Sequence, residues 1–285
     1  LSTILILSIR SAFILKYTPF TFNIVVPIFF VLLYKAITKK TKAVIPVFLY
    51  GLFPDMEALT RVAKKHDLVI IEDAAQAHGS VYKKKRAGSF GNTTCFSFYP
   101  SKVLGAFGEA GAVMTNQKDI AEKMRILRSH GEVQKGQHDV IGYNYRMEQL
   151  QGAFLRLKLK KLNQWIALRR KHSKLYSTLL GDLDPNVIAP REPSDSRSNF
   201  YVYVIRCRKR DELMKHLKLK GIDTQIHYPI PIHVQKAYRS LGYKIGSFPV
   251  AEKHAKEILS LPMYPSLQEK QIEYIADQVR KFYSL

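Results

Sequence analysis

The chain has 285 residues, of which 46% are apolar and 24% charged, so it is long enough for one large domain and a smaller one. Its two cysteines, Cys95 and Cys207, lie far apart and outside any CxxC or Cys/His cluster, which argues against a disulfide framework and favours a reducing cytoplasm. The formal charge of +22 attracts anionic ligands, but the sequence shows no stripe of basic and aromatic residues typical of nucleic-acid modules. We therefore expect solvated basic faces and no nucleic-acid partner.

The first 40 residues contain no acidic residue and differ in composition from the rest of the chain. Tyr17 to Tyr34 runs eighteen residues without a formal charge, yet a membrane span needs about 20 predominantly apolar residues, and Pro19 and Pro27 interrupt this run. Three interpretations remain: a weak membrane anchor, a buried apolar segment, or a degenerate or mistranslated stretch joined to an intact body. The abrupt change in pattern favours the last, so residues 1–36 are treated as an atypical segment.

A strand, helix and strand pattern opens the body of the chain. Ala43 to Tyr50 reads as a buried strand, a helix beginning near Asp55 continues to about Lys65, and Leu68 to Glu72 is a second buried strand. This order predicts a parallel pair joined by a right-handed crossover. Asp73 then lies just past the carboxyl end of the second strand, where open α/β sheets place their ligands.

Further elements follow in chain order up to residue 180. They are a hairpin or turn at Val81–Gly91, strands at Thr94–Phe98 and Gly111–Thr115, a helix at Lys118–Ser129 that ends at Gly131, and a long helical stretch at Met147–Leu180. Within that last stretch, Leu150, Phe154 and Leu157 recur at helical spacing. Residues 37–182 are therefore predicted to form a large domain with long connecting helices.

A composition rich in Pro, Asp, Ser and Arg between Asp182 and Ser198 marks the start of a second unit. The pattern beyond it predicts a strand at Phe200–Cys207, a helix at Arg210–Leu219, a strand near Thr224–His227 and two carboxy-terminal helices. We expect residues 183–285 to form a small α+β domain.

Lys102 and Asp73 are the most informative residues, because each follows an apolar strand. A lysine nucleophile needs a neutral amine, which an apolar setting can supply, whereas a carboxylate emerging at a sheet edge needs a partner such as a pyridinium nitrogen. Ser97, five residues before the lysine, could donate its hydroxyl to a phosphate. The alternatives are a surface lysine and a helix-capping aspartate.

Seven runs of sequence carry a resemblance to a known protein family. They are Ala43–Gly51, Ile71–Gly79, Phe96–Lys102, Gly108–Ala112, Arg128–Gly131, Gly142–Met147 and Leu150–Ala153. Together they resemble the DegT/DnrJ/StrS family of pyridoxal-phosphate-dependent sugar aminotransferases, from about Ile37 to the end of the chain. The resemblance implies an α/β fold, namely the large domain of aspartate aminotransferase fold type I, incomplete at its amino terminus, with the small α+β domain after it.

The same resemblance assigns cofactor roles by position. It implies that Lys102 bonds to pyridoxal 5'-phosphate, that Asp73 pairs with the pyridine nitrogen, that Gln76 contacts the ring or its phenolic oxygen, and that Ser97 binds the phosphate. It also implies that Asn144 reaches the phosphate held by a neighbouring subunit, which makes the protein a homodimer with shared sites.

The implied reaction transfers an amino group from glutamate to a keto sugar nucleotide, a 3-keto-6-deoxyhexose linked to dTDP or UDP, in polysaccharide biosynthesis. His227, Tyr228 and His233 lie in a segment similar to that of members acting on 3-keto sugars and are expected to face the sugar. Two histidines six residues apart could also suggest a metal, but no cysteine or carboxylate cluster accompanies them, so none is expected.

The chain departs from the family pattern before Ala43. The Ser-Gly-Thr turn that seats the cofactor phosphate has no counterpart in residues 1–36, and Phe48 stands where the family often has histidine. Losing a helix amino terminus removes phosphate donors. Two alternatives to an active enzyme therefore remain open, an inactive, truncated remnant of such an enzyme and a basic membrane-associated protein.

Overall fold

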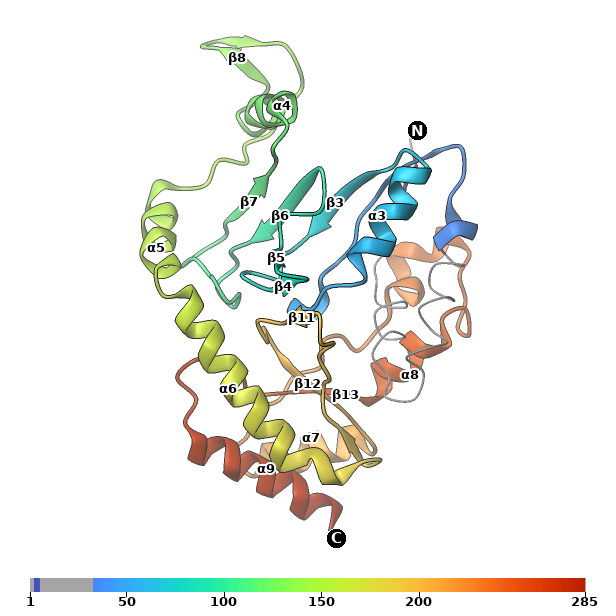
Figure 1. The fold of residues 1–285 in the computed structure, drawn as a ribbon, viewed down its shortest axis with the longest axis vertical. Helices are drawn as coiled ribbons and strands as arrows, with labels where there is room; N and C mark the ends of the chain where they lie inside the picture. Colours follow the sequence, from blue (N-terminus) through green and yellow to red (C-terminus); the bar gives the residue numbers. More distant parts are fainter. Residues whose placement is uncertain (1–2, 6–32, 285) are drawn as a thin grey trace.

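The computed structural model describes residues 3–5 and 33–284, and its centre is a five-stranded sheet in the order β1-β2-β3-β6-β7 (Figure 1). The strands are β1 (Thr3–Leu5), β2 (Thr41–Val44), β3 (Val69–Asp73), β6 (Thr93–Ser97) and β7 (Gly111–Met114). The first four run parallel to one another, and β7 runs antiparallel to β6. The expected parallel pairing of the first two body strands, β2 and β3, is confirmed.

Helix α3 (Met56–Lys65) connects β2 to β3 and packs its apolar face against the sheet. Asp55 caps it, because its Oδ1 atom accepts a hydrogen bond from the Ala58 N–H at 3.1 Å, a contact that typically contributes about 1 kcal/mol. The Tyr82 hydroxyl donates to the same Oδ1 atom at 3.0 Å. The start of α3 is thereby tied to the hairpin that follows β3.

The first body strand is shorter than its sequence predicts. It ends at Val44, and a 3-10 turn, η1 (Leu49–Gly51), follows where the sequence predicted a continuous strand. Pro46 has no N–H to offer a neighbouring strand, and Tyr50 has a positive φ of 59°, so an extended ladder cannot continue. Only Val47 keeps a strand-like bridge there, to Asp73.

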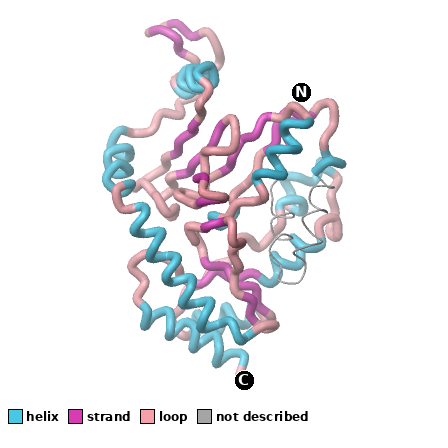
Figure 2. Tube along the Cα trace, in the orientation of Figure 1, coloured by secondary structure: helices cyan, strands magenta, loops and turns pink. Residues whose placement is uncertain are grey.

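The long helical stretch is two helices, α5 (Gln149–Leu159) and α6 (Leu162–Leu180), which meet at Lys160 and Lys161. Before them an arm made of α4 (Lys118–Arg128), β8 (Glu132–Gln134) and β9 (Gln137–His138) projects from the rest of the molecule (Figures 1 and 2). No residue of α4 is buried. Among the described residues, the arm therefore contributes no side chain to the hydrophobic cores.

A second core lies at the other end of the molecule, around an antiparallel sheet of β10 (Val187–Ile188), β12 (Tyr203–Cys207) and β13 (Ile258–Leu261). Its helices are α7 (Arg210–Leu219), α8 (Pro249–Glu257) and α9 (Glu269–Tyr283), with short turns η2 (Gly181–Leu183), η3 (Ile232–Val234) and η4 (Lys236–Leu241). The end of α6 joins this core through Tyr176 and Leu180. The strand expected near Thr224–His227 is only a single bridge, between Gln225 and Ser260.

A small sheet links the two cores. It consists of the hairpin β4 (Val81–Tyr82) and β5 (Lys85–Arg86) together with β11 (Ser196–Arg197), which precedes the second core. Because β4 follows β3 and β11 leads into β12, this pairing holds the loop after β3 beside the linker that enters the carboxy-terminal sheet (Figure 1).

Candidate active site

Two of the predicted site residues end neighbouring strands. Asp73 is the last residue of β3 and Ser97 the last of β6, and the strands align Asp73 with Cys95. The Asp73 Oδ1 atom accepts from the Ala75 N–H at 3.1 Å, and the Ser97 Oγ atom accepts from the Tyr99 N–H at 3.2 Å. Burial, and then the charge of Asp73, raise the pKa of the Cys95 thiol.

The loop after β6 carries Lys102 and is held tightly. Val103, Leu104 and Ala106 are buried, and the Lys102 N–H donates to the Tyr99 carbonyl at 2.8 Å. A Cβ atom at Gly105 would lie 2.4 Å from the Pro100 carbonyl oxygen, so only glycine fits there. The lysine backbone is therefore fixed by its own loop.

The Lys102 side chain points toward the linker that enters the second core. Its Nζ atom lies 4.8 Å from the centre of the Tyr201 ring, a cation–π distance, and the Tyr201 hydroxyl is 3.2 Å from the Ser101 Oγ atom. Arg169 of α6 donates to the Tyr201 carbonyl at 3.1 Å. The lysine is therefore in contact with both halves of the chain.

His78 lies beside the lysine and was given no role from the sequence, although it follows Asp73 in the same loop. Its ring packs between Phe96 and Phe98, with ring centres 5.3 and 5.7 Å away. Burial, and then the charge of Lys102, lower its pKa to about 4. Neither ring nitrogen makes a hydrogen bond of normal geometry within the described part of the chain. His78 is therefore a neutral, buried wall of the site.

Gln76 is 8% exposed, and its amide joins two distant segments. Its Oε1 atom accepts from the Tyr50 N–H at 2.6 Å, and its Nε2 atom donates to the Tyr228 hydroxyl at 3.1 Å. The Tyr50 hydroxyl in turn donates to the His227 carbonyl. The structure thus brings the expected cofactor residue Gln76 together with the expected sugar residue Tyr228.

Asn199 was not predicted, because it lies in the linker, far along the chain from the residues it holds. It is fully buried, and its Nδ2 atom donates to the carbonyls of Gln76 at 2.9 Å and His78 at 3.0 Å. Its Oδ1 atom accepts from the Tyr201 N–H at 2.9 Å. One side chain therefore fixes the loop after β3 to the residue that contacts Lys102.

Glu72 precedes Asp73 and is also fully buried. Its carboxylate accepts three backbone N–H groups, from Gly88 and Phe90 at 2.8 Å and from Gly91 at 2.6 Å. These bonds hold the loop that leads into β6, so Glu72 shapes the site without facing it.

The remaining predicted residues occupy different places. The His227 Nδ1 atom is 2.8 Å from the Ser260 Oγ atom of β13. His233 is 8% exposed, and its Nε2 atom lies 2.9 Å from the Glu252 Oε1 atom, so its imidazole is enclosed by the carboxy-terminal unit. Asn144 is exposed at the foot of the arm, where its described contacts are with Ser129 and Arg146.

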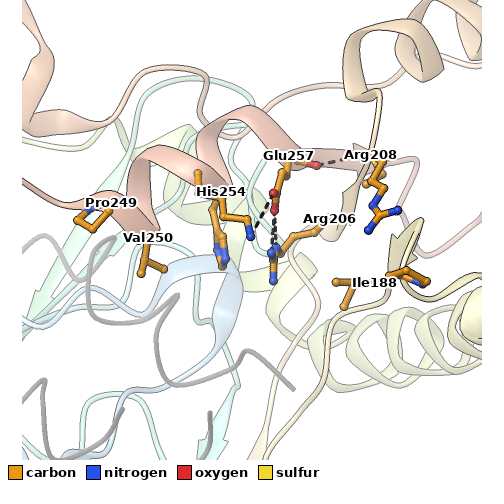
Figure 3. Close-up of a pocket in the computed structure, with 10 residues that line it drawn as sticks. Ile188, Arg206, Arg208, Pro249, Val250, His254 and Glu257 are labelled. Atoms are coloured by element: carbon orange, nitrogen blue, oxygen red, sulfur yellow. Dashed lines mark hydrogen bonds and ion pairs between the residues drawn. The ribbon is translucent and has the colours of Figure 1, made fainter. Parts of the chain in front are cut away.

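A separate hollow of about 500 Å³ lies between α8 and the start of β10, where Arg206 and Lys253 both approach Glu257 (Figure 3). None of the predicted site residues is among the described residues that line it.

In residues 3–5 and 33–284 no group of three or more His, Cys, Asp or Glu side chains could hold a metal ion. Over the same described ranges, no helix has both the length and the apolar character needed to cross a membrane. The candidate anchor Tyr17–Tyr34 lies outside these ranges except for its last two residues.

The chain is similar in sequence to a known protein family and to individual curated proteins. The model of the DegT/DnrJ/EryC1/StrS aminotransferase family matches residues 18–280, and so begins within the segment 1–36 for which no likeness was expected. A "Pleiotropic regulatory protein" of Geobacillus stearothermophilus is 48% identical over 87% of this chain and 67% of its own length. The dTDP-3-amino-3,4,6-trideoxy-alpha-D-glucose transaminase of Streptomyces venezuelae is 42% identical over 87% of this chain and 65% of its own length.

Among solved structures, the S. venezuelae protein DesV in complex with a ketimine intermediate superposes with a TM-score of 0.86 at 41% identity, covering 90% of this chain and 68% of DesV. This likeness confirms the expected α/β fold of type I. The chain spans about two thirds of the length of the curated relatives it matches.

Proposed function

The chain belongs to the DegT/DnrJ/EryC1/StrS aminotransferase family, and from this membership we propose that it transfers an amino group from glutamate to a keto sugar nucleotide. The cofactor of this family is pyridoxal phosphate. The observation that supports the proposal is that Asp73 and Ser97 end the neighbouring strands β3 and β6, and that Lys102 lies in the loop directly after β6. A cytoplasmic location accords with free thiols at Cys95 and Cys207.

The residues present fit this cofactor. A carboxylate and a hydroxyl come from the ends of the neighbouring strands β3 and β6, and an amine from the loop after β6; they match a pyridine nitrogen, a phosphate and an aldehyde respectively. His78, whose pKa is lowered by burial and by the charge of Lys102, adds a neutral ring that packs on Phe96 of β6. We therefore assign Lys102, Asp73 and Ser97 to the cofactor.

Each side chain has a distinct task. When bound, pyridoxal phosphate supplies an electron sink for negative charge that develops on the substrate carbon. Asp73 holds the proton on the pyridine nitrogen, and Ser97 orients the phosphate. Lys102, once its amine is released, moves a proton at the reacting carbon as a general acid and base. Its loop backbone is held by Tyr99, so the amine is delivered from a fixed point.

The sugar nucleotide is proposed to bind between this edge and the segment that carries His227 and Tyr228. Tyr228 is 39% exposed, so part of its ring remains accessible. His233 supports this segment indirectly by holding Glu252, whose carboxylate also accepts hydrogen bonds from the N–H groups of Gly246 and Phe248. The transaminase relative of S. venezuelae is named for a dTDP-linked 3-amino sugar, which supports a 3-keto-6-deoxyhexose on dTDP or UDP as substrate, within polysaccharide biosynthesis.

A homodimer with shared sites is proposed because the loop after β6, the segment between β9 and α5, and α5 itself expose large apolar side chains. They are Phe107, Ile141, Tyr145, Leu150 and Leu157, each at least 62% exposed. Large apolar side chains left this exposed are typical of a protein interface. A second copy on this face would cover it and bring Asn144 to the neighbouring cofactor phosphate.

Mixing two inactive chains tests the shared site. Lys102→Ala removes one contribution and Asn144→Ala the other, so a mixed dimer keeps one intact site and the mixture should recover about a quarter of the wild-type activity. No recovery, with mixed dimers present, would show that Asn144 does not act across subunits.

The reaction itself is tested with glutamate, pyridoxal phosphate and a dTDP-linked 3-keto sugar, by measuring 2-oxoglutarate and the amino sugar. The proposal expects equal amounts of both products from the wild-type chain and neither from Lys102→Ala. Lys270→Ala, exposed on α9 in the carboxy-terminal unit, is the matched control and should match the wild-type chain. A folded wild-type chain that forms neither product would contradict the proposal and favour the inactive remnant.

A further inference from the structure

The orientation of the Gln76 amide is fixed by its partners. A backbone N–H can only donate, so the atom 2.6 Å from the Tyr50 nitrogen has to be the amide oxygen. The Nε2 group therefore points the other way, toward the Tyr228 hydroxyl at 3.1 Å. This assignment does not depend on choosing between two equivalent amide flips.

The Nε2 group has two hydrogens, and the structure accounts for one of them. That one goes to Tyr228, while the second meets no acceptor among residues 3–5 and 33–284. Gln76 is 8% exposed, and an amide hydrogen buried without an acceptor is costly. An acceptor brought by a ligand would satisfy it.

The partners of Gln76 are themselves linked. Tyr50 lies in η1 after β2, and its hydroxyl donates to the His227 carbonyl. His227 precedes Tyr228, and its ring is anchored to Ser260 of β13 at 2.8 Å. Gln76, Tyr50, His227 and Tyr228 thus form a closed ring of contacts between the cofactor side and the sugar side of the site.

We propose that Tyr228 is a positioning residue for the cofactor: with Tyr50 it holds the Gln76 amide so that the second Nε2 hydrogen donates to the phenolic oxygen of pyridoxal phosphate. This inference rests on the proposed function. Cofactor binding and ordering of segment 225–230 then strengthen each other, since coupling between two sites is reciprocal. The sugar-binding segment is therefore set in place by the cofactor before the sugar arrives.

The size of the effect follows from one hydrogen bond. A neutral hydrogen bond typically contributes about 1 kcal/mol, so Tyr228→Phe should weaken pyridoxal phosphate binding about fivefold. The phenylalanine keeps the edge contact that the Tyr228 ring makes with the His227 ring, whose centre is 5.6 Å away. Gln76→Glu keeps the acceptor for Tyr50 but has no amide hydrogens, so it should weaken binding further.

The test measures two quantities on the full chain: the dissociation constant of pyridoxal phosphate by absorbance titration, and amide hydrogen exchange in segment 225–230 with and without the cofactor. We expect the cofactor to slow this exchange in the wild-type chain and not in Tyr228→Phe. Tyr243→Phe, a half-exposed tyrosine whose ring packs on Phe248, is the control and should behave as wild type in both measurements.

The outcomes separate the two claims. If the wild-type chain binds pyridoxal phosphate through Lys102 and Tyr228→Phe binds it equally well with the same slowing of exchange, the positioning role is refuted and the proposed function stands. If the wild-type chain binds no pyridoxal phosphate, both are refuted. A fivefold weaker Tyr228→Phe that has lost the slowing supports the inference, because a merely structural tyrosine would not make exchange depend on the cofactor.

Discussion

Replacing Asn199 with aspartate should destabilise the protein strongly, although the two side chains have almost the same shape. The amide nitrogen of Asn199 donates to the carbonyls of Gln76 and His78, at 2.9 and 3.0 Å, in a fully buried position. In Asn199→Asp an oxygen faces these two carbonyl oxygens, and no hydrogen bond forms with either. No cavity is created, so the effect reports hydrogen bonding and charge alone.

The magnitude follows from these contacts. Two net hydrogen bonds are worth about 1 kcal/mol each, and an uncompensated charge in a buried network typically costs about 3–5 kcal/mol. The bond from the Tyr201 N–H, which the Asn199 Oδ1 atom already accepts at 2.9 Å, becomes charge-assisted and offsets about 1 kcal/mol, so we expect a loss of about 4–6 kcal/mol in the free energy of unfolding.

Urea unfolding followed by circular dichroism measures this loss from the shift of the midpoint at constant slope. Asn163→Asp is the control: Asn163 is exposed on α6, so this substitution introduces the same charge into solvent. Surface substitutions seldom change the free energy of unfolding by more than about 1 kcal/mol. If Asn199→Asp differs from the control by less than this, the Asn199 side chain does not hold the loop after β3.

Three further predictions concern buried groups near the same loop. Burial and the charge of Lys102 lower the pKa of His78 to about 4 in the folded chain, so below about pH 6.5 the unfolded chain takes up a proton that the folded chain does not. Acidification from pH 6.5 to 4 should therefore lower the free energy of unfolding by up to about 3 kcal/mol. In His78→Phe the free energy of unfolding, measured against pH, should fall less steeply over this range. Glu72→Gln keeps the shape, but its NH2 group cannot accept where one carboxylate oxygen stood, so at least one of the three bonds is lost and the others lose their charge assistance. It should lower the free energy of unfolding by about 2–3 kcal/mol and speed amide exchange at the three N–H groups; unchanged exchange would count against this role. Gly51→Ala places a Cβ atom 1.9 Å from the Asn199 Oδ1 atom at a φ of 84°, and should cost more than about 2 kcal/mol, whereas Gly181→Ala, at helical φ with open space around it, should change the midpoint little.

The strand ends could be predicted from the sequence, and the long-range partners could not. Apolar runs before Asp73 and before Lys102 mark strands that end at one sheet edge, so local pattern was enough to place both residues. Asn199 bonds to a loop more than a hundred residues earlier, and a lone asparagine in a polar linker carries no signal of that contact. The division near residue 182 also stays a prediction, since the end of α6 packs into the carboxy-terminal core.

Some patterns were present in the sequence but describe surface rather than core. Leu150, Phe154 and Leu157 do lie on one helix, at the expected spacing, yet they are 70%, 41% and 62% exposed. Helical spacing shows that a face is apolar and does not show what covers it. The contact of His233 with Glu252 is one that the sequence spacing does not reveal, and its expected role at the sugar stays a prediction.

The central claim is that Lys102 bonds to pyridoxal phosphate in this chain. The most direct measurement is to add pyridoxal phosphate, reduce with borohydride, digest the protein and locate the labelled lysine by mass spectrometry. The account predicts one dominant label, at Lys102, that appears at cofactor concentrations too low to label other lysines and that is absent from folded Lys102→Ala. Labelling spread over surface lysines, or equal in both chains, would contradict it.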